Sequence, residues 1–113
     1  MTKAERMQVY HKYGGRCAYC GKKIQYRDMQ VDHIVPKCMG GTEYNPSCRR
    51  CNHYKRAHSL EMFREMLKTL HERIRDIYIC KVAEDYGIIE IKEWNGLFYF
   101  EKVGGENDQI NIT

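Results

Sequence analysis

The first stretch with a regular hydrophobic pattern runs from Thr2 to Gly15. Apolar or aromatic residues recur there every three positions, which predicts one buried face of a short helix: Ala4, Met7, Tyr10 and Tyr13. Thr2 and Glu5 have the spacing of a capping box. In this motif the side chain of each residue accepts a hydrogen bond from the backbone N–H of the other. Gly14 and Gly15 follow as a typical helix stop.

Residues 29–35 alternate well enough between apolar and polar side chains to predict a strand. Pro36 would end this strand, because proline has no N–H to donate to a neighbouring strand. Residues 37–45 contain two adjacent glycines and predict a loop, and a short second strand is expected before Cys48. A helix is expected to begin at Cys51.

The second half of the chain predicts two further helices. Ser59 is expected to cap the first, whose apolar residues recur at helical spacing: Phe63, Leu67, Leu70, Ile74 and Ile77. Residues 76–86 predict the next helix, with Gly87 as its stop, and residues 97–100 predict a terminal strand. We therefore expect one α+β domain over residues 1–103, divided into a motif core at 13–58, a helical extension at 59–103 and a flexible tail at 104–113.

Charge is distributed unevenly along the chain. Residues 1–56 hold 12 Lys and Arg against 4 Asp and Glu, whereas residues 57–113 hold 7 against 11. The basic half suits a phosphate backbone as partner, although a solvated basic surface gives the same pattern. No stretch approaches the ~20 apolar residues of a membrane span, and the polar N-terminal residues do not form the apolar region of a signal peptide. We expect a cytosolic protein with no membrane partner.

Four of the six cysteines form two Cys-x-x-Cys pairs: Cys17 with Cys20, and Cys48 with Cys51. Thiolates bind zinc tetrahedrally, and two such pairs fill all four positions, so we predict a structural zinc site with no position open for catalysis. A redox centre would instead need a single pair at a helix start. Cys80 is expected to be a small buried residue, and Cys38 to lie in the loop after Pro36.

Asp32 and His33 lie between the two cysteine pairs, and Asn52 directly follows the second. Hydrolysis of a phosphodiester needs an activated water and stabilised charge on the phosphate and the leaving oxygen. Histidine is suited to take the proton from water near neutral pH, and Asp32 and Asn52 offer oxygen ligands for Mg²⁺ or another divalent cation. Because neighbours on a strand face opposite sides, Asp32 and His33 meet at one site only if the strand ends or twists there.

Basic residues flank Asn52 on both sides. Lys55 and Arg56 follow it at i+3 and i+4, so all three would share one face of the expected helix. We predict contacts with nucleic-acid phosphates for these two residues and for their neighbours Arg49, Arg50 and His53. The alternative for each is an ordinary solvated charge.

Taken together, Cys-x-x-Cys, Asp-His-Ile-x-Pro, Gly-Gly and Cys-x-x-Cys-Asn-x-x-Lys resemble the HNH endonucleases, which are ββα-metal nucleases. The motifs cover residues 13–58, and the flanks look like those of small phage and prophage HNH proteins. The resemblance implies a zinc-stapled ββα-metal domain with flanking helices that cuts DNA. It also implies that His33 is the general base, that Asp32 and Asn52 hold the catalytic cation, and that phage or restriction proteins are partners.

The chain departs from the family pattern at two positions. Some members place a histidine ligand one helical turn after the helix ligand, where this chain has Arg56. The middle asparagine of the family usually lies slightly earlier, where this chain has Glu43, which makes Asn45 the nearest candidate. We expect the Asn45 side chain to orient His33 by bonding the backbone of the Pro36–Thr42 loop.

Two other functions fit the zinc staple. One is a zinc-stapled DNA-binding module without cleavage activity, and the other is a structural zinc domain in a phage assembly. The acid at Asp32 favours the enzyme, because a carboxylate beside a phosphate backbone repels it unless a cation lies between them.

Overall fold

The computed structural model describes residues 1–34, 40 and 43–104. Contacts divide the chain into two compact units, of which one contains Met1–Leu60 and Leu97–Thr113 and the other Glu61–Gly96. We describe each unit by itself. Every residue predicted to carry chemistry belongs to the first unit. The description of the site is therefore the same whether residues 1–103 are counted as one domain or as two.

Helix α1 spans Lys3–His11 and begins with the predicted capping box, since Thr2 accepts from the Glu5 N–H and Glu5 bonds back to Thr2. The predicted apolar face is partly wrong. Val9 is the buried residue of the helix, whereas Met7 is 40% exposed. Ala4 and Met7 are exposed, whereas Tyr10 and Tyr13 are half-buried and pack against Tyr26 and Phe100.

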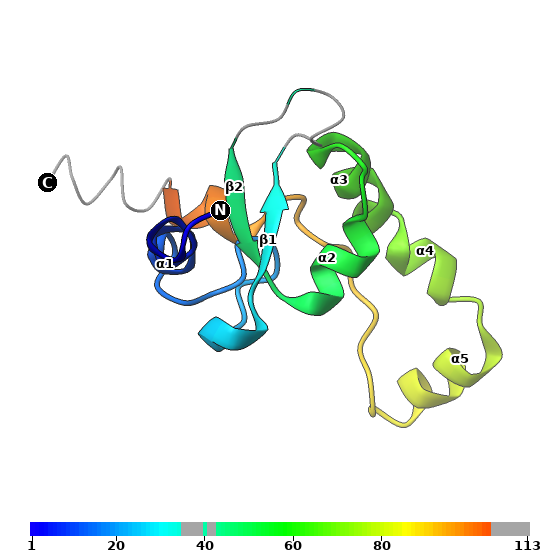
Figure 1. Cartoon of the computed structure of the whole chain (residues 1–113). Coiled ribbons are helices and arrows are strands. Elements are labelled where there is room, and N and C mark those ends of the chain that lie inside the picture. The colour runs from blue at the N-terminus through cyan, green and yellow to red at the C-terminus, as the bar shows by residue number, and fades with distance from the viewer. Residues whose placement is uncertain (35–39, 41–42, 105–113) are drawn as a thin grey trace, which may run out of the picture. The chain divides into compact units, whose positions relative to one another are not determined.

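Strands β1 (Gln30–His33) and β2 (Tyr44–Ser47) form an antiparallel pair, and α2 (Arg49–Lys55) follows directly, as Figure 1 shows. The register places Asp32 opposite Asn45 and His33 opposite Tyr44. Both predicted strands are confirmed, although β1 is shorter than residues 29–35. The ββα unit carries Asp32, His33, Asn45 and Asn52 within 21 residues of sequence.

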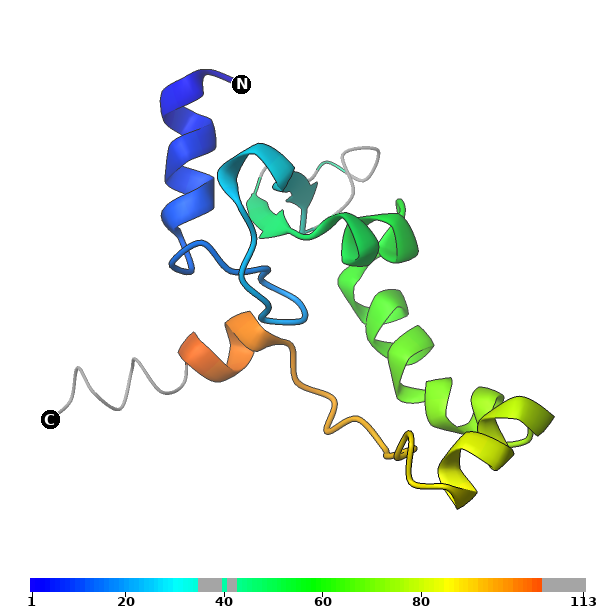
Figure 2. The same ribbon diagram turned by 90° about the horizontal axis from the view of Figure 1, so that it is seen from below.

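Aromatic rings form the core beneath the ββα unit. Tyr19 packs edge-on against Phe98 and Phe100, at centroid distances of 5.4 and 6.1 Å. The predicted terminal strand at 97–100 is wrong, because residues 99–104 are helical. Their first amides bond instead to the loop that carries Tyr19, with Tyr99 N to Tyr19 O at 3.0 Å and Phe100 N to Ala18 O at 2.8 Å, and Figure 2 shows this helical segment beside that loop.

The second unit contains α3 (Leu60–Lys68, whose first residue belongs to the first unit), α4 (Leu70–Ile74) and α5 (Tyr78–Asp85). The predicted helix from Ser59 is thus two helices that break at Thr69. Phe63 is buried as predicted, but Ile77 is 46% exposed and is not a core residue. The prediction of a buried Cys80 is also wrong, since it is half-exposed, while Cys38 lies outside the described residues.

The fold class is confirmed as a small α+β protein with a two-stranded sheet, helices and a four-cysteine cluster. Among the described residues, no helix has both the length and the apolar character needed to cross a membrane.

Candidate metal centre and active site

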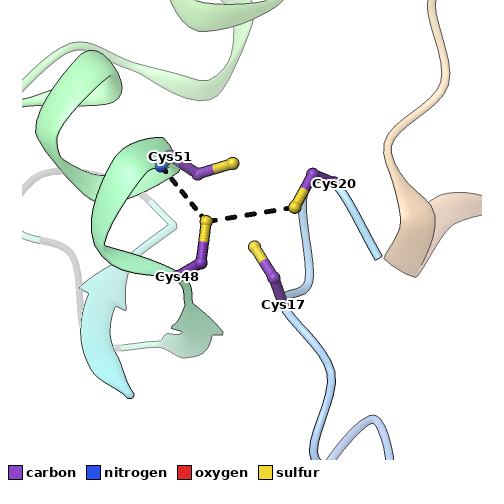
Figure 3. Close-up of side chains that lie close together, drawn as sticks. All are labelled: Cys17, Cys20, Cys48 and Cys51. Carbon is purple, nitrogen blue, oxygen red and sulfur yellow. Dashed lines mark hydrogen bonds between the residues drawn. The ribbon is translucent and has the colours of Figure 1, made fainter. Parts of the chain in front are cut away.

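The four predicted cysteines converge on one point between the start of α2 and the loop after α1 (Figure 3). Their Sγ atoms all lie within 4.8 Å of one another, and the Cys20 and Cys48 sulfurs are 3.9 Å apart. A tetrahedral ion with bonds of about 2.3 Å to sulfur requires sulfurs about 3.8 Å apart. The geometry therefore fits a tetrahedral metal site.

Local backbone structure explains why each cysteine pair points inward. Gly21 has φ +82°, and its N–H bonds to the Cys17 carbonyl at 3.0 Å, which closes a tight turn around the first pair. A Cβ at Gly21 would lie 2.8 Å from the Tyr99 ring, so the turn also requires the absence of a side chain. In the second pair, the Cys48 sulfur accepts the Cys51 N–H at 3.3 Å and caps α2.

The thiols of this cluster influence one another strongly. Hydrogen bonds from Cys20 and then Cys51 lower the pKa of Cys17, whereas hydrogen bonding to Cys17 and Cys20 raises the pKa of Cys51. The first thiolate to form thus keeps its neighbours protonated. Four thiolates in this space need a bound cation, which is the chemistry that a zinc ion supplies.

Asp32 is the second-last residue of β1, and it is only 5% exposed. The Tyr19 hydroxyl donates a short hydrogen bond to its Oδ2, and the Lys55 ammonium lies 3.1 Å from the same oxygen. Burial, followed by the hydrogen bond to Asp32, raises the pKa of Tyr19, so the phenol keeps its proton and remains a donor. Asp32 is therefore held by a phenol and an ammonium from two other parts of the chain.

Lys55 does not lie on the phosphate-facing surface that helix periodicity predicted. Its side chain is 1% exposed, and its ammonium also donates to the His33 carbonyl at 3.0 Å. The reason is electrostatic: a buried carboxylate needs a partner, and the last turn of α2 brings Lys55 beneath β1. Lys55 consequently joins the side chain of Asp32 to the backbone of His33.

Asn45 is fully buried opposite Asp32, and its Oδ1 accepts a hydrogen bond from Lys12 Nζ at 3.2 Å. Its amide nitrogen is buried and forms no hydrogen bond within the described part of the chain. The residues 36–39, 41 and 42 of the loop to which we expected it to bond lie outside the described residues. A buried amide donor of this kind requires an acceptor, so the expected bond to the loop remains a prediction.

His33 is the last residue of β1, and its ring packs against Tyr44 at 4.8 Å between centroids. The strand ends there, which was the condition for Asp32 and His33 to serve one site. Asn52 lies in α2, half-buried, with its backbone bonded to Cys48 at one end and Arg56 at the other. The cysteine cluster and the Asp32 network are thus joined by one short helix.

Part of this chain is similar in sequence to known proteins. Residues 17–68 match the family model described as HNH endonuclease. This segment, a little under half of the chain, is similar to an HNH endonuclease domain. The match begins at Cys17 and includes both cysteine pairs, the ββα unit and α3.

Two curated relatives of the chain are the CRISPR-associated endonucleases Cas9 of Corynebacterium diphtheriae and of Actinomyces naeslundii. Each is 36% identical over 55 residues, which is 44% of this chain. The matched stretch is about 5% of the length of either relative. No solved structure matches the chain significantly.

The remaining basic residues predicted to contact nucleic-acid phosphates lie on the surface. Arg49, Arg50, His53 and Arg56 are all exposed. Arg56 departs from the shared helix face, because α2 ends at Lys55 and Arg56 has φ +52°, outside the helical region. Their contact with DNA remains a prediction.

Pattern reasoning missed two residues that bond to the ββα unit, namely the buried Tyr19 and the exposed Lys12. Neither Tyr19, which lies between Cys17 and Cys20, nor Lys12 was among the predicted site residues. For Tyr19 the available signal was the acid in a strand, since a buried carboxylate needs donors. The sequence did not say which of the many donors would reach it.

Proposed function

We propose that this protein is a metal-dependent endonuclease that hydrolyses phosphodiester bonds in DNA, with His33 as general base. The observation that supports this most is the ββα unit, in which Lys55 ties the Asp32 side chain and the His33 backbone together beneath the end of β1. That unit lies inside the segment that matches the HNH endonucleases.

Asp32 and Asn52 would hold the catalytic divalent cation, Mg²⁺ or another. The donor set fits a hard cation, because both residues offer oxygen. Asp32 Oδ2 is taken by Tyr19 and Lys55, whereas Oδ1 has only a 3.5 Å contact with Lys55 and keeps lone pairs for a cation. A cation bound there supplies charge stabilisation to the phosphate and to the leaving sugar oxygen.

The chain's own residues would then act on the water and the phosphate. The His33 imidazole takes a proton from water as the water oxygen attacks phosphorus, and the bond from phosphorus to the leaving sugar oxygen breaks. Tyr44 limits the orientations of the imidazole through its ring contact. Asn45 is proposed to act behind it, by holding the loop that follows His33.

Lys55 has a positioning role in this proposal. Its two bonds keep Asp32 and the His33 carbonyl at fixed distances, and small errors in such positions can lower a rate ~10²-fold. The Cys17, Cys20, Cys48 and Cys51 cluster would hold structural Zn²⁺, and would thereby fix the start of α2 and with it Asn52. Arg49, Arg50, His53 and Arg56 remain the proposed surface contacts with DNA, in a cytosolic setting with phage or restriction proteins as partners.

One observation favours the alternative of a DNA-binding module without cleavage. Lys55 already places a positive charge 3.1 Å from the Asp32 carboxylate. The carboxylate therefore does not need a divalent cation to prevent repulsion of a phosphate backbone, and its presence alone does not distinguish an enzyme from a binding module.

The deciding experiment is cleavage of supercoiled plasmid by the wild-type protein with Mg²⁺, with Mn²⁺ and with chelator. Zinc content is measured in the same samples, so that loss of the staple is not mistaken for loss of the catalytic cation. We expect nicked or linear product with the added cation only. Binding of the plasmid without any product, in a sample that retains zinc, would instead support the binding module.

A further inference from the structure

A basic groove lies beside the cysteine cluster, away from the end of β1 that carries His33. Its volume is about 500 Å³, and its lining includes Lys22, Lys23, Arg27, Asp28, Cys48 and Arg49. Small-molecule pockets are lined mainly by apolar and aromatic side chains. This groove is lined by four cations against one acid, which is unsuited to an apolar ligand and suited to a polyanion.

The four cations are exposed, and none forms an ion pair with a residue that the structure describes. Lys12 and Lys55 contrast with them, because both donate hydrogen bonds inside the first unit. A charge that has no ion-pair partner among the described residues and lies in a hollow beside like charges is available for an anion from outside. The groove is therefore a surface of unsatisfied positive charge.

The walls of the groove are held by backbone bonds. The Lys22 carbonyl accepts from Cys17 N at 2.9 Å, and Lys23 pairs with Arg16 in an isolated β-bridge. Arg27 sits in a short 3-10 helix, Tyr26–Asp28, whose carbonyl at Tyr26 accepts from Arg6 at 3.0 Å. The cations thus project from a fixed frame, which lowers the ordering cost of binding.

We propose that this groove binds the phosphate backbone of duplex DNA next to the bond that is cut. The inference rests on the proposed nuclease function and adds a second contact site to it. Gln30 lines the groove and His33 is three residues further along β1, roughly 10 Å at 3.3 Å per residue. At 3.4 Å per base pair, a backbone in the groove is about three steps from one at His33.

The test uses the His33→Ala protein, which removes the proposed base but leaves the groove intact. Binding of a labelled duplex is measured by fluorescence anisotropy across a salt series, with and without the added changes Lys22→Gln, Lys23→Gln and Arg27→Gln. Each phosphate contact contributes about 0.9 to the slope of log K against log salt. We expect the triple change to reduce the slope by about 2 to 3 and to weaken binding at low salt by at least tenfold.

The control changes the same net charge elsewhere, with Lys3→Gln, Lys81→Gln and Lys102→Gln at three exposed positions outside the groove. We expect its slope to fall by less than 1. Equal slopes for the groove variant and the control, or no DNA binding by the parent protein at low salt, would overturn the proposal. The readout is binding and not cleavage. If the wild-type protein binds DNA through the groove but never cuts it, the proposed nuclease function is refuted and the proposed DNA-binding groove is not.

A second measurement locates the contact on the DNA. Single neutral methylphosphonates are placed in turn along the duplex, and the loss of affinity is compared between the parent and the groove variant. A position that weakens the parent at least fivefold and the groove variant less than twofold identifies the phosphate in the groove. Equal losses at every position would contradict a specific subsite.

Discussion

Four thiols from two segments surround one point at the start of α2, whereas a carboxylate, a phenol and an ammonium meet beneath the end of β1. The close thiols act on one another, since hydrogen bonds within the cluster lower the pKa of Cys17 and raise that of Cys51. The carboxylate of Asp32 already has a cation, supplied by Lys55. The start of α2 thus carries four thiols that could hold a metal, whereas Lys55 at its other end supplies a charge of the chain itself.

This difference assigns separate tasks to the two regions. A closed four-sulfur site has no position for substrate, so a metal bound there would act through folding. Oδ2 of Asp32 already has Tyr19 and Lys55 as partners, so a cation bound at Asp32, as we propose, would be free to serve chemistry. The following variants test that separation, beginning with the largest expected effect.

Loss of one cysteine ligand is expected to unfold the first unit. Structural zinc contributes on the order of 10 kcal/mol to the folding of small domains, so Cys48→Ser should lose zinc and its cooperative thermal transition. Cys80→Ser is the matched control, because Cys80 lies outside the cluster and is half-exposed. It should keep about one zinc per chain. A folded, zinc-free wild-type protein would refute the staple.

Replacement of Lys55 is expected to lower the free energy of unfolding by less than loss of zinc does. The decrease should be larger than for loss of any neutral contact with Asp32. Lys55→Met leaves Asp32 buried without its cation, and breaking such a pair typically costs about 3–5 kcal/mol. Denaturant unfolding measures the loss. The double variant Lys55→Met with Asp32→Asn removes both charges and should recover at least half of the lost stability.

The same Lys55→Met protein also tests the proposed cation site. If Asp32 binds a divalent cation, Mg²⁺ should raise the melting temperature of Lys55→Met more than that of the wild type, because it replaces the missing charge. Equal shifts in the two proteins would indicate that the cation binds elsewhere.

Removal of the Tyr19 hydroxyl should have a moderate effect. Tyr19→Phe keeps the ring that packs on Phe98 and Phe100 but deletes one hydrogen bond to a charged group, which is worth about 1.5–3 kcal/mol. Unfolding by denaturant measures this, and Tyr99→Phe serves as the aromatic control. A loss below about 0.5 kcal/mol would mean that the hydroxyl contributes little to holding Asp32.

The smallest expected effect is a gain in stability of the folded protein. Arg56 has φ +52° at the end of α2, a conformation that costs a non-glycine residue about 1 kcal/mol or more. Arg56→Gly should therefore stabilise the protein slightly, by up to about 1 kcal/mol. Arg50→Gly, inside the helix, should destabilise it by a similar amount. A destabilising Arg56→Gly would show that the arginine side chain forms a contact worth more than the strain.

The cysteine cluster could be predicted from sequence because its geometry is local. Each Cys-x-x-Cys pair fixes two sulfurs within one turn, and only the meeting of the two turns depends on the fold. The ββα order was predictable for the same reason, since alternation and the positions of glycine and proline act over a few residues.

The Asp32 network could not be predicted in this way. Lys55 is 23 positions from Asp32, and helix periodicity described which face it shares with Asn52 but not whether that face is buried. The prediction of a strand at residues 97–100 was wrong for a related reason. Its aromatic composition favours a strand, but its amides find acceptors at Ala18 and Tyr19, and the chain turns into a helix there.

The most direct test of the account is single-turnover cleavage of plasmid DNA with Mg²⁺ by the His33→Ala protein beside the wild type. Zinc content, melting temperature and DNA affinity are measured on the same two preparations. The account predicts that the variant keeps all three properties and loses cleavage by at least ~10²-fold, the lower end for a general base. Cleavage by His33→Ala at the wild-type rate would contradict it, because the base would then lie elsewhere.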